Sequence, residues 1–518
     1  MSLPWQKVDS SERRPNGADN RHTNMIEDAV HIHDRFQFEI KLAYNLHDHA
    51  DKTTYGVETY IFFPDTLGVN RHSYTKDDFY SDIQAYVRFK TPSRRINNLV
   101  AGDPNPLDKL KRRLTEVLAR ADYNTRSNYE YEAKMFCNIV KSALRDHVQF
   151  VRDGKQPVDV EDLVRKYADG IDALVAEYRK LRSEANVPGA HSDIFAIYLY
   201  ADEYVSLLIE TYTYQLLEYL RKHRSDMFEQ YKVRLLAIVN REVAYRRENG
   251  YPSIPQEHSE NEMLMFRKNV LKKYMGSALF LNTRVRREGE LIIQAIFALA
   301  AGLAMLFATA VAFFTQRKYG TYTFPFVIAV VIGYMFKDRM KELTRLYLGG
   351  KVKRFLYDHR MNIYSSARDR IGRLRESFDF IKERDIPGKI LRMRNRDHIT
   401  EIESDWMGEK TILYRKRVTI FTKKLRAIYN NRQIESINDI MRFNVTRFLG
   451  KMDDPKKPIY VADETDYHRI YGERVYHLNM ITRYIMENTI HYKRFRIVLN
   501  RDGIKRIETV ADDEEQIT

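Results

Sequence analysis

A run of 24 residues without a charged side chain, residues 291–314, constrains this 518-residue chain more than any other feature. A helix of that length would measure about 36 Å, which exceeds the roughly 30 Å hydrocarbon core of a bilayer. A second uncharged run, residues 320–336, follows after only five residues. We therefore predict a hairpin of two antiparallel transmembrane helices over residues 291–336. A buried soluble hairpin is one alternative, and a re-entrant second segment that does not span the membrane is the other.

Small residues recur along the first run at spacings that let helices approach one another closely. They are Ala298, Gly302, Ala304, Ala308 and Ala312. We favour packing within the hairpin for these positions over packing against another subunit. Neither run contains Asp, Glu, Lys, Arg or His, so an ion-coupled carrier is not expected.

Basic residues flank both apolar runs, and they predict that both flanks lie in the cytoplasm. The flanking positions are Arg284, Arg286 and Arg287 before the first run, and Lys337, Arg339 and Lys341 after the second. We expect these six side chains to face anionic lipid headgroups. The chain is thus predicted to be a two-span protein of the cell (inner) membrane with both termini in the cytoplasm.

The sequence before the membrane segment divides into several regions. Residues 1–30 are polar and predict a flexible N-terminus, and residues 31–100 predict a small α+β subdomain. Residues 101–250 have the pattern of a helical bundle, with a tyrosine- and leucine-rich stripe that we interpret as bundle core. Beyond a linker that contains Gly250 and two prolines, residues 256–290 predict a juxtamembrane helix.

Two local patterns within residues 31–100 predict specific elements. Apolar and polar residues alternate over residues 36–44 and again over 55–63, which predicts that these strands pair as an antiparallel hairpin. Thr75 with Asp78 three residues later predicts a capping box at the start of a helix that extends to about Lys90.

The sequence after the membrane segment is expected to begin with a helical stalk. Residues 337–386 contain a possible hinge at Gly349 and Gly350. A narrow apolar seam from Ile363 to Ile381 in steps of three and four predicts that the stalk pairs with another helix. Residues 387–511 predict a basic α+β domain, and residues 512–518 form an acidic tail.

Three elements are predicted within the basic domain. Alternation over residues 412–420 predicts a strand, residues 434–449 predict a short helix, and residues 495–510 predict a hairpin around an Asn-Arg-Asp-Gly turn. The whole chain is therefore expected to be mostly α, with a two-helix transmembrane hairpin. Its other parts would be a small N-terminal subdomain containing a β-hairpin, a helical bundle and an α+β C-terminal cytoplasmic domain.

The basic excess of the chain lies after the membrane segment. The chain has 86 Lys and Arg and 71 Asp and Glu residues. Residues 1–290 hold 44 basic and 43 acidic residues, whereas residues 337–518 hold 40 basic and 28 acidic residues. A basic surface is predicted at Arg392, Arg394, Arg396, Arg415, Lys416, Arg417, Lys493, Arg494 and Arg496. We favour a solvated or protein-binding face, with nucleic acid or nucleotide as the alternative partner.

Signatures of catalysis and metal binding are scarce. The chain has no phosphate-binding glycine loop, nucleophile elbow or kinase motif set, and its single cysteine, Cys137, excludes a disulfide framework within the chain. His47, His49 and Asp51 could hold a divalent metal such as zinc, although a solvated polar loop is the favoured interpretation. No other cofactor is predicted.

Three functional hypotheses follow from these features. The first is a non-catalytic membrane protein whose cytoplasmic domains act as sensor, scaffold or effector, coupled to the membrane hairpin through the stalk. Its expected partners are a bilayer with anionic headgroups and a second copy of the chain or a cytoplasmic protein. The alternatives are an oligomeric pore gated by the cytoplasmic domains, and a membrane-tethered enzyme acting on nucleotides or nucleic acid.

Overall fold

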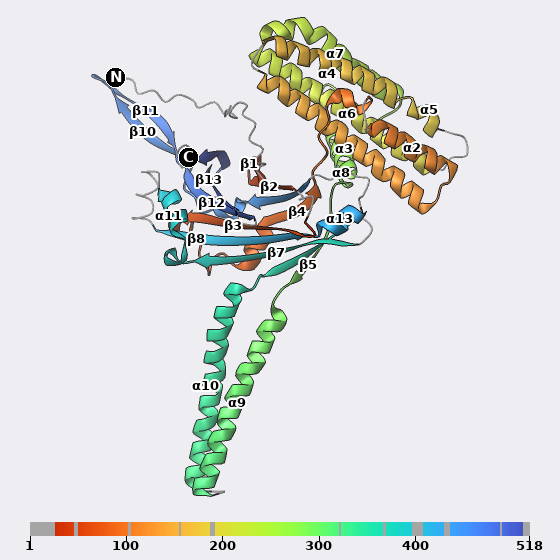
Figure 1. The fold of residues 1–518 in the computed structure, drawn as a ribbon. Coiled ribbons are helices and arrows are strands. Elements are labelled where there is room, and N and C mark those ends of the chain that lie inside the picture. Colours follow the sequence, from red (N-terminus) through yellow and green to blue (C-terminus); the bar gives the residue numbers. More distant parts are fainter. Residues whose placement is uncertain are drawn as a thin grey trace.

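The computed structural model has three parts: a helical bundle, a β domain, and a long helical hairpin that projects from the β domain (Figure 1). The structure describes residues 26–45, 50–101, 105–154, 157–186, 192–320, 323–365, 369–395, 408–428, 436–486 and 489–510. Helix makes up 53% and strand 29%, so the chain is mixed and the mostly α expectation holds only in part. Residues 1–25 and the acidic tail lie outside the described residues.

The bundle consists of helices packed side by side in the region where the sequence predicts them (Figure 1). Its helices are α2 (Pro106–Ala119), α3 (Tyr123–Asp153), α4 (Pro157–Tyr178), α5 (Leu181–Ala185), α6 (Ser192–His223), α7 (Ser225–Glu248) and α8 (Glu262–Gly276). Tyr198, Tyr204 and Leu208 of α6 are buried, as the core interpretation of the tyrosine-rich stripe requires.

The β domain is built from two antiparallel sheets that share one apolar core. The large sheet has the order β14-β13-β12-β3-β8-β7-β6-β5, and the small sheet has the order β1-β2-β9-β4. Their strands are β1 (Ile26–Asp34), β2 (Gln37–Asn45), β3 (Thr53–Pro64), β4 (Ile83–Phe89), β5 (Asn282–Arg287), β6 (His359–Tyr364), β7 (Arg370–Ile381), β8 (Glu409–Ile420), β9 (Ser436–Asn444), β12 (Tyr476–Met486), β13 (Thr489–Asn500) and β14 (Gly503–Val510).

Smaller elements complete the β domain. They are the helices α1 (Lys76–Asp82), α11 (Gly388–Asn395), α13 (Thr422–Ile428) and α14 (Thr446–Leu449), and a two-stranded ribbon of β10 (Lys456–Ala462) and β11 (Tyr467–Glu473). The capping box at Thr75 and Asp78 is confirmed, but α1 ends at Asp82, where β4 begins, and not near Lys90. The predicted strand 412–420 corresponds to β8, and the predicted terminal hairpin is β13–β14.

The separate N-terminal subdomain and the N-terminal hairpin are wrong predictions. β3 lies between β12 and β8 in the large sheet, whereas β2 pairs with β1 and β9 in the small sheet. Segments on either side of the bundle therefore complete the same two sheets. Alternation identified the strands, but pairing between residues some 400 positions apart leaves no local signal.

Several predicted helices are also wrong. The juxtamembrane helix ends at Gly276 and gives way to β5, and the stalk helix ends at Phe355 and gives way to β6 and β7. Apolar residues from Ile363 to Ile381 match a helical spacing, but the segment also alternates with a period of two. In β7, Arg373 and Arg375 alternate with the buried Leu374. The predicted helix 434–449 is mostly strand β9, whose buried Asp439 interrupts the apolar alternation.

The hairpin is formed by α9 (Glu290–Tyr319) and α10 (Phe324–Phe355), which leave the edge of the large sheet from β5 and β6 (Figure 1). α10 is continuous helix across Gly349 and Gly350, so the structure shows no break at the predicted hinge. A Cβ at Gly333 of α10 would lie 3.2 Å from Val311 Cγ1 of α9. The two helices therefore pack closely along this seam.

The predicted packing residues of α9 divide into two groups. Ala304 is buried and Ala308 and Ala312 are half-buried, on the side that packs against α10. Ala298 and Gly302 are exposed, and nothing lies within 4 Å of a Cβ built at Gly302. The prediction of contacts within the hairpin is therefore wrong for these two residues.

One helix in the described chain is long and apolar enough to cross a membrane, residues Ile293–Tyr319 of α9. Only 11% of its most apolar window is buried. α10 does not meet the same criterion, because its uncharged part ends at Phe336 and Lys337, Asp338 and Arg339 follow. A hairpin of two spanning helices is thus not supported, although the helical hairpin itself is present.

Candidate anion-binding site

Four of the nine residues of the predicted basic surface have partners inside the β domain. Lys416 is buried and lies 2.5 Å from Asp439, and Arg394 is buried 2.6 Å from Glu409. Arg494 is buried and donates to the Met393 carbonyl at 2.7 Å, and Arg496 lies 3.4 Å from Glu508. These four side chains stabilise the fold and do not form a ligand surface.

The remaining members of that prediction are dispersed. Arg392 and Lys493 are exposed, and Arg396 lies outside the described residues. Arg415 and Arg417 of β8 instead point to the face of the large sheet that lies opposite the core, since Tyr414, Lys416 and Val418 between and beside them are buried. We call this side the outer face.

Seven arginines occupy the outer face of strands β5–β8, and we call this cluster the arginine face. Its members are Arg284, Arg286, Arg360, Arg373, Arg375, Arg415 and Arg417. Four of them lie directly opposite one another in register, in the order Arg286, Arg360, Arg375 and Arg417. Like charges directly opposite one another destabilise a sheet, so this row is costly unless an anion offsets it.

Alternation along the strands explains how the arginine face forms. Met361 of β6, Leu374 of β7 and Val418 of β8 are buried in the core. Their neighbours must therefore point outward, because successive side chains of a strand alternate between its two faces. The sequence predicted Arg415 and Arg417 as basic surface and Arg284 and Arg286 as lipid-facing residues. It did not predict Arg360, Arg373 and Arg375, because their segment was assigned to a helix.

Few carboxylates balance this cluster. Arg375 lies 3.0 Å from Glu288, and Arg415 donates to the Ser377 hydroxyl at 3.1 Å. The Nε atoms of Arg360, Arg373 and Arg375 are buried and have no hydrogen-bond partner among the described residues. Burial, together with the neighbouring Arg360, Arg375 and Arg370, lowers the pKa of Arg373. Among the described residues, the seven arginines therefore share this face with the carboxylates of Glu288 and Glu58, the latter opposite Arg415 in register.

A cavity of about 440 Å³ opens beside the arginine face, and we call it the Tyr357 cavity. It is lined by Lys52, Thr54, Gly56, Val57, Glu58, Tyr357, Arg415, Lys416, Arg417 and Ile485. Glu58 is its only lining carboxylate, and that group already pairs with Arg483 at 3.0 Å. Its volume lies within the usual range of small-molecule sites, roughly 300–1,000 Å³.

A larger cavity, of about 650 Å³, lies between β7, β8 and α11, and most of the cations that line it are paired with carboxylates. Each of three cations that line it has a carboxylate partner: Arg71 pairs with Asp379 at 3.4 Å, Arg394 with Glu409, and Lys410 with Asp65 at 3.4 Å. The Tyr357 cavity is therefore the better candidate for an anionic ligand, despite its smaller volume.

The predicted metal site is not supported by the described residues. His47 and His49 lie outside them, and Asp51 is exposed. Among the residues that the structure describes, no group of three or more His, Cys, Asp or Glu side chains could hold a metal ion.

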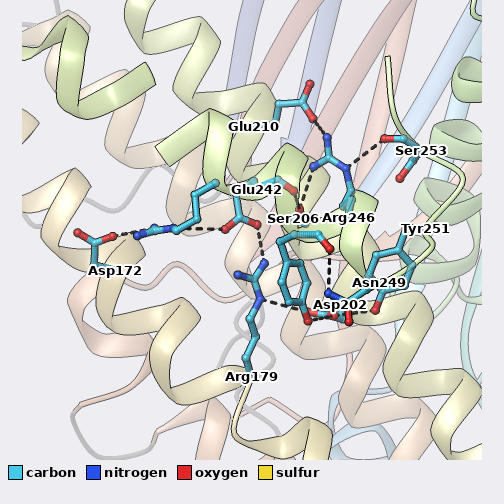
Figure 2. A network of polar contacts seen from close by, with 12 residues as sticks. Asp172, Arg179, Asp202, Ser206, Glu210, Glu242, Arg246, Asn249, Tyr251 and Ser253 are labelled. Atoms are coloured by element: carbon cyan, nitrogen blue, oxygen red, sulfur yellow. Dashed lines mark hydrogen bonds and ion pairs between the residues drawn. The ribbon is translucent and has the colours of Figure 1, made fainter. Parts of the chain in front are cut away.

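The bundle contains a second charge cluster that sequence analysis missed (Figure 2). Arg246 is fully buried and donates to the Ser253 carbonyl at 3.1 Å, to the Ser206 hydroxyl at 2.8 Å, and to Glu210. Arg179 pairs with the buried Glu242 at 2.7 Å. The signal in the sequence is the presence of Asp202, Glu203 and Glu210 within the apolar helix α6.

This bundle network is balanced. Asp202 accepts hydrogen bonds from the hydroxyls of Tyr245 and Tyr251, each at 2.7 Å, and Glu203 pairs with Arg267 at 2.6 Å. The network joins α5, α6, α7, α8 and the linker after α7. Because each of these carboxylates has a basic or hydroxyl partner, we assign the network to the architecture of the bundle and not to a ligand site.

Comparison of the chain with protein-family models, curated proteins and solved structures finds no match.

Proposed function

We propose that this protein is a membrane-anchored, non-catalytic sensor or scaffold whose β domain binds a phosphate-rich anion on the arginine face. The observation that carries this proposal is the row of four arginines in register across β5–β8, with Glu288 as the paired carboxylate. A polyanion would offset the repulsion within the row, and guanidinium groups bind phosphate oxygens in a two-point geometry.

The apolar surface of the hairpin supports a membrane anchor. Side chains that are more than half exposed include Phe313 and Phe314 on α9 and Phe324, Val331 and Met335 on α10. A monomeric soluble protein rarely exposes a continuous apolar surface of this extent. Hydrocarbon is the solvent in which such a surface is stable.

Basic residues lie at two levels along the hairpin, and each level defines a different depth of insertion into the membrane. Arg284, Arg286 and Arg287 lie beside the hairpin root, whereas Lys337 lies 18 residues before the end of α10, about 27 Å away at 1.5 Å per residue. One membrane surface cannot pass through both levels at once. The six residues predicted to face lipid headgroups therefore cannot all lie at one membrane surface.

We place the membrane surface at the level of Lys337, Arg339 and Lys341. Insertion up to the root would bury these residues together with Asp338 and Glu342, and each charge at the centre of a bilayer costs about 2.5–3.5 kcal/mol. The uncharged part of α10, Phe324–Phe336, is about 20 Å long. Lys337 after it, and Arg317 and Lys318 in the last turn of α9, can extend toward the headgroups. In this arrangement the root half forms a stalk and leaves the arginine face accessible from water.

The depth of insertion can be measured on the full chain in phosphatidylcholine nanodiscs. A fluorophore on Val331→Cys should be quenched by acyl-chain spin-labelled lipid, and one on Leu346→Cys should not. Cys137 is buried, so the introduced thiol is labelled selectively. Equal quenching at both positions would show insertion up to the root, and quenching at neither would exclude the anchor.

Anion binding is tested with sodium tripolyphosphate on the full chain in the same nanodiscs. We expect the Arg286→Ala, Arg360→Ala double variant to bind at least tenfold more weakly than the wild type. Binding should also weaken as salt increases, because salt screens interactions between accessible charges. The matched control removes two exposed arginines of the bundle, Arg120 and Arg247, and should bind as the wild type does. Equal affinity of both double variants would refute the proposal.

A further inference from the structure

We propose that the Tyr357 cavity binds the terminal phosphate of a small phosphate monoester that carries a ring. This inference rests on the proposed function and specifies the ligand class of the same face. The arginine row supplies a general positive field, whereas the cavity adds a defined shape, a lone aromatic side chain and a set of converging cations.

The charge of the cavity fits a dianion. Lys52, Arg415 and Arg417 line it, and Glu58 is engaged by Arg483 at 3.0 Å and by the Tyr60 hydroxyl at 3.3 Å. A phosphate monoester has a second pKa near 6 and carries almost two negative charges at neutral pH. A sulfate ester or a carboxylate carries only one, so the cavity should favour the phosphate.

The floor of the cavity is shaped by a glycine. Gly56 of β3 lies in register between Arg417 of β8 and Ile485 of β12. A Cβ at Gly56 would lie 3.3 Å from the Cβ of Ile485, so a side chain would fill the space between its two neighbours. The absence of a side chain at this position lets a ligand approach the strand backbone next to the Arg417 guanidinium.

Tyr357 connects the cavity to the hairpin. It follows the end of α10 at Phe355 by two residues and precedes β6, and it lines the cavity. The guanidinium of Arg375 lies 5.9 Å from the centre of the Tyr357 ring, which holds the ring over the arginine face. A ligand ring stacked on Tyr357 would contact the segment through which the β domain is joined to its anchor.

The test is calorimetric titration of the full chain in phosphatidylcholine nanodiscs with phenyl phosphate and with phenyl sulfate. These probes have the same ring and nearly the same shape but differ by one charge. We expect phenyl phosphate to bind at least tenfold more tightly. Equal affinities, or no binding of phenyl phosphate, would overturn the inference.

Two variants locate the site. Arg417→Ala removes a cation from the cavity, and Ile485→Trp fills the cavity without changing its charge; each should weaken phenyl phosphate at least tenfold. Arg392→Ala removes the same charge from an exposed position of the β domain that lies outside both the arginine face and the cavity lining, and it should weaken phenyl phosphate less than threefold. If Arg392→Ala costs as much as Arg417→Ala, or if Ile485→Trp has no effect, the phosphate does not bind in the cavity.

Two further titrations separate the possible failures. If tripolyphosphate binds and phenyl phosphate shows no preference over phenyl sulfate, the cavity assignment fails and the proposed function stands. If neither phosphate probe binds, both fail. The placement of the membrane also makes the ligand a soluble molecule, so phosphatidic acid added to the nanodisc should not compete with phenyl phosphate. Competition would overturn the soluble source.

Discussion

The bundle and the large sheet each gather arginines, and they differ in what surrounds those arginines. In the bundle, Arg246 is bound to Glu210 and two oxygens, and Arg179 is bound to Glu242 (Figure 2). On the sheet, Arg286, Arg360, Arg375 and Arg417 lie opposite one another, and Glu288 pairs with Arg375. In the bundle each of these two arginines has a carboxylate partner, whereas among the described residues the row of four arginines on the sheet has one, Glu288.

The bundle network and the arginine face differ in how far carboxylates balance their arginines, and not in whether basic residues are present. Sequence analysis located the basic excess in the correct half of the chain. It then counted Lys416, Arg394 and Arg494 as surface, although each is buried with a partner. Only the register of the strands shows which arginines lie opposite one another on the outer face.

The largest effect is expected when the balanced cluster is broken. Arg246→Met should lower the free energy of unfolding by about 3–5 kcal/mol, because it leaves the carboxylate of Glu210 buried without its partner. Chemical denaturation of the full chain in detergent measures the change. Arg247→Met, at the exposed neighbouring position, should change stability by less than about 0.5 kcal/mol. A small effect of Arg246→Met would mean that the network is not structural.

A smaller effect is expected for a substitution at Lys141 of α3, which lies near other cations. Burial, together with the nearby Lys272, Arg88 and Arg145, lowers the pKa of Lys141 to about 8. At pH 7 the amine is charged in both the folded and the unfolded chain, and its charge destabilises the folded state. Lys141→Met should therefore stabilise the protein by up to about 3.5 kcal/mol at pH 7, at roughly 1.4 kcal/mol per pKa unit.

The same substitution has a characteristic pH dependence. As pH rises from 8 to 10.5, the folded chain loses the Lys141 proton before the unfolded chain does, so the wild type gains stability relative to the variant. The advantage of Lys141→Met should thus shrink over this window and disappear above it. Denaturation curves at pH 7 and pH 10.5 measure it, and an advantage that does not change with pH would contradict the assignment.

Local patterns predicted individual elements better than their assembly. The capping box at Thr75, the tyrosine-rich core of α6 and the strand β8 could be identified because each depends on neighbouring residues. The pairing of β3 with β8 and β12 could not be, because it joins segments separated by the bundle and the hairpin.

The sequence predicted only part of the candidate site, because its residues come from segments that are distant in the sequence. Arg415 and Arg417 were identified, yet nothing in the local pattern shows that Gly56, Tyr357 and Arg375 gather beside them. The hairpin was predicted from composition, but only its packing shows that Lys337 of α10 lies far along α9 from the root. The proposed depth of insertion therefore depends on the packing of the two helices and not on the hydropathy of either run alone.

The smallest expected effect of a single substitution is on the arginine face in the absence of ligand. Arg360→Met should leave the free energy of unfolding unchanged or raise it by up to about 1 kcal/mol, because it removes a like charge from between Arg286 and Arg375. This direction is opposite to that expected for Arg246→Met.

The most direct test of the account is unfolding of the wild type and of Arg360→Met, each with and without tripolyphosphate. A ligand that binds only the folded state at one hundred times its Kd stabilises that state by about 2.7 kcal/mol. We predict that the order of stability reverses: the variant is at least as stable as the wild type without tripolyphosphate and less stable than the wild type with it. A variant that is less stable by more than about 2 kcal/mol without the ligand, or a wild type that gains nothing from it, would contradict the assignment of the arginine face as an anion-binding site.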